Sequence, residues 1–174
     1  MDATLLRSIQ APIKDRYREQ PDTALITLRA DGSLSEGIAC SVQTGRALVE
    51  AGLHPATGGD GSLACSGDML LQALVACAGV TLQSVATSIG VDVRDGSVWA
   101  EGDLDFRGTL AVDKEAPVGF RAIRLTFDLD TDATDEELAT LLRLTERYCV
   151  VLQTLKAGTA PIASLTRRGE PDVA

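Results

Sequence analysis

GGDGSLACSGDMLLQALVACAGVTLQSVATSIG, residues 58–90, is the stretch that decides the fold. Its first part is rich in glycine and small polar residues, which is typical of a loop. From Gly67 to Ile89 apolar side chains cover nearly the whole circumference of a helix, and such a helix must be buried on most sides. Ser66 is placed to cap this helix and Gly90 to end it. The sequence therefore predicts a long, buried helix at the centre of the domain.

Extended segments precede this helix. Strands are predicted at Leu25–Leu28 and Gly37–Val42, and the Asp-Gly pair within Ala30–Ser33 predicts a hairpin turn between them. A further strand is expected around Arg46–Val49. These segments indicate a hairpin and one further strand ahead of the helix.

Further strands follow the helix. Val91–Val93 with Ser97–Phe106, and then Phe120–Leu129, have the alternation of apolar and polar residues that is typical of antiparallel strands with one face in water. Pro161–Thr166 is expected to form a last short strand. The central helix is thus predicted to be flanked by strands on both sides in the sequence.

Two more helices are expected near the C-terminal end. Thr134 and Glu137 have the spacing of a capping box, which predicts a helix start, and the apolar pattern continues to about Tyr148. A shorter helix follows from Cys149 or Val150 to Ala157, with Gly158 as its stop.

The predicted elements form one domain with an arm before it. Leu5–Glu19 has helical spacing that Pro12 interrupts, so residues 1–22 are interpreted as a short helical arm. Residues 23–174 contain no long linker and no internal repeat. The fold class predicted for them is α+β, with an antiparallel sheet packed on the long central helix.

The composition restricts the class of function. The chain has 16 Lys plus Arg against 25 Asp plus Glu, a net charge of −9, and no basic run that could bind nucleic acid or an anionic membrane. Its most continuous apolar stretch, Ala73–Val80, falls far short of the roughly 20 residues of a membrane-crossing helix. The first twenty residues lack the apolar run of a secretory signal. We therefore expect a cytoplasmic protein with no nucleic-acid or membrane partner.

The candidates for chemistry are four cysteines. In a reducing compartment, a bond between two of them would more often be catalytic or redox-sensing than structural. The single histidine, His54, precedes a proline and is expected to be an ordinary exposed loop residue. Neither the cysteine spacing nor the GGDGS segment matches a zinc site or a phosphate loop, so no metal or bound cofactor is expected. The cysteines are Cys40, Cys65, Cys77 and Cys149.

The positions of Cys77 and Cys149 allow two interpretations: an inert structural thiol or a reactive nucleophile. Cys77 is in the middle of the predicted central helix and Cys149 at the boundary between two helices, so both are expected near the centre of the domain. A free cysteine usually behaves as a small buried hydrophobe, and a buried thiol with no electropositive neighbour is inert. With such a neighbour, the thiol becomes a nucleophile.

Two segments resemble the motifs of the OsmC/Ohr family. GGDGSLACSGDMLLQALVACAGVTLQSVA resembles the family's central motif, in which a glycine-rich loop leads to a carboxylate, a Leu/Ala-rich helix and a reactive cysteine. TERYCVVLQTL resembles its second-cysteine motif. The resemblance covers Thr23–Thr166 and implies an OsmC-like fold in an intertwined homodimer. It further implies a cytoplasmic peroxidase that reduces organic hydroperoxides in oxidative stress and is recycled by a dithiol reductant.

The resemblance also implies roles for individual residues. Cys77 matches the peroxide-reacting cysteine and Cys149 the resolving one. Asp68 stands where the family has a glutamate, and Arg46 or Arg29 matches the family's arginine, with Arg46 favoured because it is closer to the glycine-rich loop. Only about 3% of an ordinary thiol, with a pKa of about 8.5, is ionised at pH 7, and a neighbouring guanidinium would raise that fraction. The sulfenic acid formed on Cys77 would then condense with Cys149.

Helix geometry adds an inference about Asp68. Nine residues separate it from Cys77, which on a continuous helix is about 13.5 Å along the axis and about half a turn in direction. The two side chains cannot share a site within one helix. If both serve one centre, the carboxylate comes from a second chain; otherwise Asp68 is a first-turn acid that the helix dipole favours.

Departures from the family pattern leave other functions open. Asp68 has a shorter reach than glutamate, and Val150 follows the second cysteine where many members have proline. Cys40 and Cys65 are additional thiols, and Cys65 is placed just before the central helix. The alternatives to a hydroperoxide reductase are a non-catalytic protein of the same fold that binds an apolar small molecule, with structural cysteines, and a redox sensor that oxidises without turnover.

Overall fold

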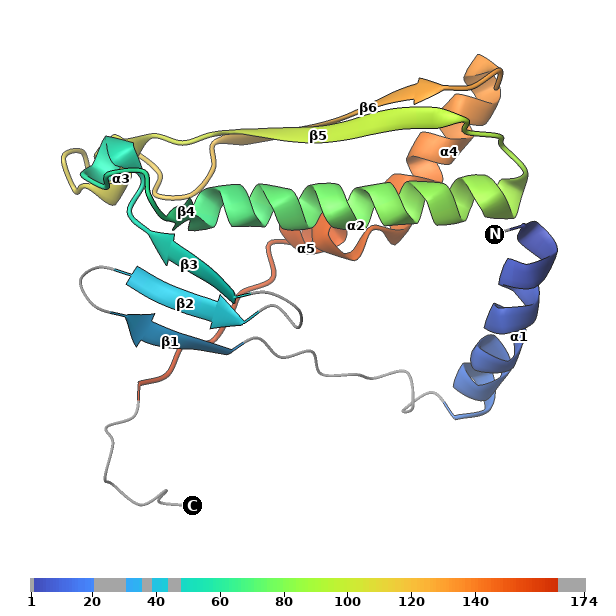
Figure 1. Ribbon diagram of the computed structural model, residues 1–174, viewed down its shortest axis with the longest axis horizontal. Coiled ribbons are helices and arrows are strands. Elements are labelled where there is room, and N and C mark those ends of the chain that lie inside the picture. The colour runs from blue at the N-terminus through green and yellow to red at the C-terminus, as the bar shows by residue number, and fades with distance from the viewer. Residues whose placement is uncertain (1, 21–30, 36–38, 44–47, 166–174) are drawn as a thin grey trace.

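The described residues form helices and two small sheets, where the sequence predicted helices and an antiparallel sheet. Figure 1 shows the computed structural model, which describes residues 2–20, 31–35, 39–43 and 48–165. Helix α2 (Ser66–Ile89) passes through the middle of the molecule, with the β5–β6 sheet along one side and β1–β3 near its N-terminal end on another (Figure 1). The chain is therefore α+β in class.

The first sheet has the strand order β1-β2-β3-β4. Ser35 pairs with Ala39, so the chain reverses between these two residues rather than in Ala30–Ser33. The predicted Asp-Gly turn is wrong because Asp31 and Gly32 are paired within a strand, opposite Gln43 and Val42. The strands are β1 (Asp31–Ser35), β2 (Ala39–Gln43), β3 (Leu48–Gly52) and the short parallel β4 (Ala64–Cys65).

Two predictions in this region have different outcomes. The strand expected around Arg46–Val49 is observed as β3, displaced toward the C-terminus. The strand expected at Leu25–Leu28 lies outside the described residues, as do Arg29 and Arg46.

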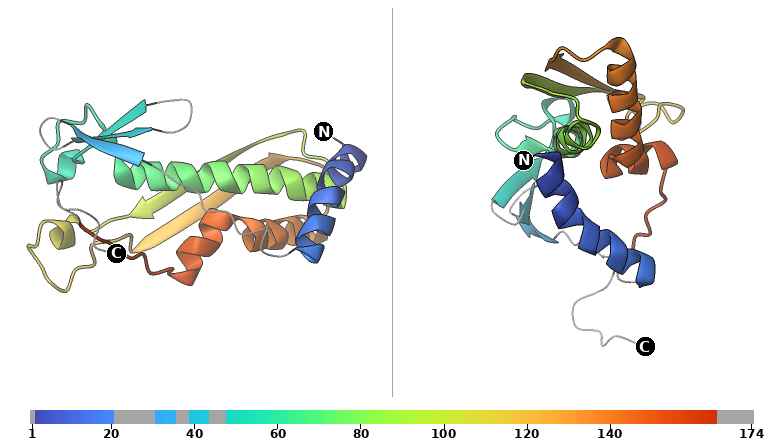
Figure 2. Two further views of the ribbon diagram at one scale, coloured as in Figure 1. Left: turned by 90° about the horizontal axis from the view of Figure 1, so that it is seen from below. Right: turned by 90° about the vertical axis from the view of Figure 1, so that its right-hand side faces the viewer.

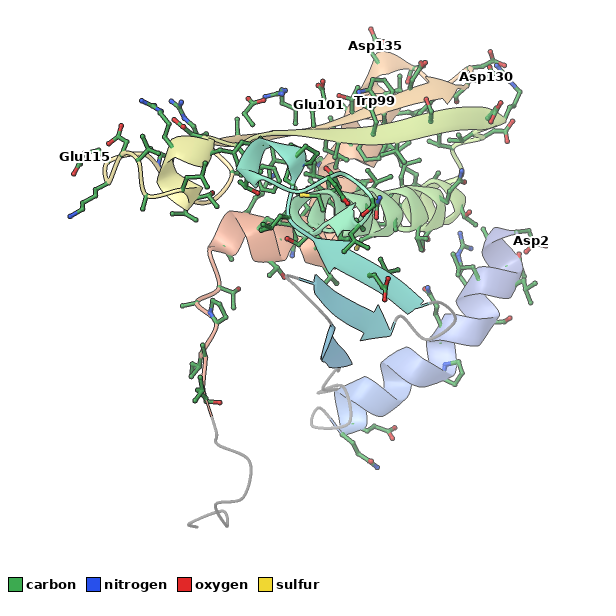
Figure 3. All side chains as sticks on the ribbon, turned by 60° about the vertical axis from the view of Figure 1, so that its left-hand side comes forward. Asp2, Trp99, Glu101, Glu115, Asp130 and Asp135 are labelled. Carbon is green, nitrogen blue, oxygen red and sulfur yellow. The ribbon has the colours of Figure 1, made fainter. Side chains whose placement is uncertain are left out.

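The second sheet pairs β5 (Asp95–Asp103) with β6 (Ala122–Asp130) in antiparallel fashion. Side chains alternate along it: Val98 and Ala100 are half-buried, whereas Trp99 and Glu101 project from the face away from α2 (Figure 3). The prediction of two antiparallel strands with one wet face is confirmed.

Three details of the predicted strands are wrong. Val91–Val93 is not a strand, although its valines pack on the core. Phe106 begins the short helix α3 (Phe106–Thr109), whose N-cap Asp105 accepts from the Arg107 N–H, so the strand ends earlier than expected. Residues 161–165 have no strand partner among the described residues, and Thr166 lies outside them.

The C-terminal helices match their predicted boundaries. In α4 (Asp135–Tyr148) the hydroxyl of Thr134 accepts from the Glu137 N–H at 3.3 Å, and the Glu137 carboxylate accepts from the Thr134 N–H at 2.8 Å. Helix α5 (Val150–Ala157) ends at Gly158, which adopts the left-handed conformation, φ 60°. Helices α4 and α5 both run beside α2 (Figure 2). The capping box and the glycine stop are confirmed.

The arm before the domain is also helical. Helix α1 (Ala3–Glu19) continues through Pro12, which the sequence had suggested would interrupt it. Its N-terminal part lies near the C-terminal end of α2 (Figure 1). The division into an arm and a domain stays a prediction.

Helix α2 is buried on one face only. Its N-cap is Cys65 rather than Ser66, and Gly90 ends it in the left-handed conformation as predicted. The buried positions follow helical spacing on the face that packs against the β5–β6 sheet, α4 and α5: Leu74, Ala78, Leu82, Val85 and Ala86. On another face Val80 is 73% exposed. The expectation of burial on most sides is therefore wrong for the single chain.

The length of α2 bears on the expectation about membranes. By length and composition this helix could cross a membrane, contrary to what its longest unbroken apolar run indicated. The core helix of a soluble protein meets the same criterion, and α2 packs on a sheet and two helices. No membrane protein is indicated.

The glycine-rich loop before α2 is shaped by close backbone contact. A Cβ at Gly59 would lie 1.8 Å from the carbonyl oxygen of Leu53, so only glycine fits there. Gly58 ends the 3-10 turn η2 (Pro55–Thr57) at φ 95°, a left-handed conformation. Close backbone contact at Gly59 and the left-handed conformation at Gly58 account for glycine at these two positions.

Replacing Thr134 with alanine should lower the free energy of unfolding by about 1 kcal/mol, because the Glu137 N–H loses its capping acceptor. Urea unfolding followed by circular dichroism measures this change. Thr134→Ser, which keeps the hydroxyl, is the matched control and should stay close to the parent protein. Equal stability of the two variants would contradict the role of the cap.

Candidate active site

Two sulfurs that are remote in the sequence meet beside the middle of α2. Cys77 comes from α2, and Cys149 lies between α4 and α5. They pack in one apolar cluster with Leu74 and Ala78. Cys149 is fully buried and Cys77 half-buried, and both are free thiols. The structure therefore brings together the two cysteines that the sequence had singled out.

A break between two helices positions Cys149. This residue is at once the C-cap of α4 and the N-cap of α5, with an extended backbone (φ −71°, ψ 107°). Its N–H donates to the carbonyl of Thr145 at 2.9 Å, and its own carbonyl accepts from the Gln153 N–H at 2.9 Å. One helix thus ends and the next begins on the same residue, which directs the N-terminus of α5 toward α2.

The surroundings of Cys77 favour its thiolate. Burial by itself would raise the pKa of Cys77, but weak hydrogen bonds from the Val151 N–H, the Cys149 thiol and the Val150 N–H outweigh it. The pKa of Cys77 is therefore lowered from that of an ordinary thiol. The largest of these favourable contributions come from uncharged groups.

Cys149 has the opposite tendency. Burial raises its pKa first of all, and the neighbouring Cys77 thiolate adds to the rise. Backbone N–H groups of Leu152 and Val151 oppose these effects without cancelling them. Between the two pKa values the pair consequently holds one negative charge, on Cys77, with Cys149 as the neutral donor.

The structure places the expected activating residues away from this pair or does not describe them. Asp68 is exposed in the first turn of α2, and α2 is continuous from there to Cys77, so the two side chains are apart within one chain. Arg46 and Arg29 lie outside the described residues. Sequence reasoning missed the backbone donors of Val150 and Val151, which carry no side-chain motif.

The remaining candidates lie elsewhere. Cys65 and His54 line a hollow of about 430 Å³ at the N-terminal end of α2. The ring of His54 stacks on Phe106 with centroids 4.9 Å apart, and its Nδ1 accepts from the Ala56 N–H at 3.0 Å. His54 is thus a half-buried structural residue rather than an exposed one. Cys40 lies in β2.

Metal-ligating side chains are not grouped in the described part of the chain. Among residues 2–20, 31–35, 39–43 and 48–165, no three His, Cys, Asp or Glu side chains lie together in a way that could hold a metal ion. The chemistry that the described site can support is that of its two thiols.

Fold and site together define a class: an α+β protein with a pair of free thiols between its central helix and a helix break. The family model that matches the chain is that of OsmC-like proteins, over residues 59–163. This match covers more than half of the chain and includes both cysteines. The protein belongs to the OsmC-like family, as the sequence motifs indicated.

Solved structures share this fold at low sequence identity. An OsmC-like protein from Mycoplasma pneumoniae superimposes with a TM-score of 0.64 at 14% identity, covering 75% of this chain and 88% of its own. An organic hydroperoxide resistance protein OsmC from Legionella pneumophila gives 0.59 at 16% identity, with 76% and 90% coverage. An organic hydroperoxide resistance protein from Elizabethkingia anophelis has a TM-score of 0.59 at 17% identity, covering 75% of this chain and 89% of its own. No match was found among curated protein sequences.

Iodoacetamide, which reacts with thiolates, should modify Cys77 before Cys149 at pH 7. The pKa of Cys77 is lowered and that of Cys149 raised, so the thiolate fraction is larger on Cys77. The rate should fall as the pH drops through the pKa of Cys77, because the thiolate takes up a proton. Peptide mass spectrometry over a pH series gives both rates.

Cys77→Ser is the control for this assignment, and the low-pH reaction should vanish in it. Faster modification of Cys149 than of Cys77 in the folded parent protein would contradict the order of the two pKa values.

Proposed function

We propose that this protein is a thiol-dependent hydroperoxide reductase with Cys77 as the peroxide-reacting nucleophile and Cys149 as the resolving thiol. The observation that supports it is the packing of Cys77, whose pKa is lowered, against Cys149, whose pKa is raised. A ready nucleophile beside a protonated partner is what a two-cysteine peroxidase requires. Membership of the OsmC-like family and similarity in fold to organic hydroperoxide resistance proteins agree with this proposal.

The proposed reaction has three steps. The Cys77 thiolate attacks the terminal oxygen of the hydroperoxide; an S–O bond forms, the O–O bond breaks, and the alkoxide leaves as the alcohol after taking a proton from water. The Cys149 thiol then attacks the sulfenic sulfur, and water leaves as the disulfide forms. A dithiol reductant restores both thiols by exchange.

An apolar groove beside the cysteine cluster favours an organic substrate. The groove holds about 390 Å³ and shares Leu74, Leu152 and Leu155 with the cluster around Cys149. Neither sulfur is among its lining residues. An alkyl or fatty-acid hydroperoxide has the apolar surface that such walls accept, whereas hydrogen peroxide has none.

The same groove favours the second candidate, a non-catalytic protein that binds an apolar small molecule. Thr145 is one of its lining residues and is 1% exposed, and the Thr145 hydroxyl has no hydrogen-bond partner among the described residues. A buried hydroxyl without a partner is costly, and a bound molecule with one polar group would satisfy it. In this case both cysteines would only fill space in the core.

Counting free thiols after treatment with cumene hydroperoxide separates these two functions. The reductase should lose two thiols per chain within the time of mixing, and the disulfide should join Cys77 to Cys149 in peptide maps. Cys77→Ser should abolish the loss, and Cys149→Ser should stop the reaction at a sulfenic acid that dimedone traps. If all thiols persist in the parent protein, the reductase proposal is wrong and the binding function is favoured.

The proposed enzyme acts as a cytoplasmic homodimer in which Asp68 of one chain, with Arg46 or Arg29, serves Cys77 of the other. Asp68 is too far from Cys77 along α2 to serve it within one chain. The exposed apolar side chains of α2, such as Val80 at 73% and Leu70 at 38%, offer a surface that a second chain would cover.

Mixing two inactive variants tests this arrangement. Asp68→Asn and Cys77→Ser should each be strongly impaired alone. If Asp68 acts on the partner, a heterodimer of the two variants carries one intact site and one doubly altered site, so refolding them together should restore about a quarter of the parent activity. If Asp68 acts within its own chain, every site carries one defect and the mixture should stay inactive. Turnover of cumene hydroperoxide with a dithiol is the readout.

A further inference from the structure

The first turn of α5 carries backbone donors that have no acceptor within the helix. The first hydrogen bond inside α5 runs from the Gln153 N–H to the Cys149 carbonyl, so the N–H groups of Val150, Val151 and Leu152 precede the helical ladder. Cys149, the N-cap, has a sulfur where Ser, Thr, Asp or Asn would offer oxygen, and it makes no conventional side-chain cap. The N–H groups of Leu152 and Val151 also contact the Cys149 sulfur. The Val150 N–H is therefore the donor that Cys149 leaves to another group.

Cys77 is the group that packs there. It belongs to the cluster that contains Cys149 and Val151, at the N-terminal end of α5. Its sulfur receives weak hydrogen bonds from the Val151 and Val150 N–H groups. The partial positive charge of a helix N-terminus adds to the attraction for an anion at this position. Among the described residues, Cys149, at the break between α4 and α5, is the titratable group that contributes to the pKa of Cys77.

We propose that the backbone N–H of Val150, together with that of Val151, binds the Cys77 sulfur as its anion, so that the first turn of α5 is a cradle for the nucleophile. The proposal rests on the proposed function only in taking Cys77 as the reacting thiol. Val150 is then a residue whose backbone, not its side chain, controls reactivity. Its side chain points outward and is 69% exposed.

The local geometry allows one donor to be removed by substitution. Val150 is the first residue of α5, the helical position that proline tolerates because its missing N–H has no partner in the helix. Cys149 already has the extended backbone that a residue before proline adopts (φ −71°, ψ 107°). Val150→Pro thus deletes the N–H while the break between α4 and α5 is kept.

The experiment measures the pKa of Cys77 in the reduced, full-length protein from the pH dependence of its alkylation by iodoacetamide. Val150→Pro should raise this pKa by about half a unit or more, which is about threefold less thiolate at pH values below it. Val150→Ala, the matched control, keeps the N–H and should titrate within about 0.2 unit of the parent protein. Identical pKa values for the proline and alanine variants would overturn the proposal.

A second replacement removes the N–H without a proline ring. Protein semisynthesis can insert an ester in place of the amide between Cys149 and residue 150, which keeps the valine side chain. The ester protein should show the same rise in the pKa of Cys77 as Val150→Pro. The rate constant of the fully ionised thiolate should rise by less than about twofold, because a more basic thiolate is slightly more nucleophilic. A rise in the proline variant alone would also overturn the proposal, because it would trace the effect to the ring.

These outcomes are independent of the reductase proposal. Alkylation reports the ionisation of Cys77 whether or not cumene hydroperoxide is turned over. If the parent protein fails to reduce the peroxide and the two backbone variants still raise the pKa, the proposed function is wrong and the cradle stands. If turnover occurs and the pKa values are equal, the reverse holds.

Discussion

The contact between the middle of α2 and the break between α4 and α5 is the constraint on which the other features depend. Small residues allow it: Ala78 is fully buried in the cluster with Cys149, and a Cβ at Gly79 would already touch Val98 of β5 at 3.4 Å. Close approach on both sides fixes α2 between the sheet and the two helices. Because α4 ends and α5 begins on Cys149, the same contact presents the first turn of α5 to Cys77.

The ion pairs of the described residues lie away from the cysteine pair. In the described residues, ion pairs gather on the β5–β6 sheet, where Arg124 contacts Asp103 at 2.6 Å and Arg94 contacts Asp130 and Asp132. The side chains of these groups are 42–88% exposed, so water and salt weaken their contribution to stability. At Cys77 the leading groups are uncharged backbone donors and a thiol in a buried cluster. Weak dipoles matter more there, because little water competes with them.

Much of the fold could be predicted because it is encoded locally. The capping box at Thr134 and the glycines at 90 and 158 act within one helical turn, so their signals are complete in a few residues. The hairpin turn could not be predicted in the same way. Asp31 and Gly32 have the chemistry of a turn, but their pairing with Gln43 and Val42 holds them in a strand. The burial of α2 was overestimated, because an apolar circumference does not say which face is covered within the same chain.

The candidate site, like the fold, was predictable from the sequence only in part. Cys77 and Cys149 could be proposed because their side chains form part of motifs, and packing then placed them together. The backbone donors of Val150 and Val151 could not be proposed from the sequence. Every residue but proline has an N–H, and a pair of valines is typical of any hydrophobic core. The sequence held one indirect signal for these donors. A cysteine, rather than a residue with a side-chain oxygen, occupies the N-cap position of α5. The first N–H groups of a helix have no acceptor within the helix, and an anion that the fold brings to them has its charge stabilised there.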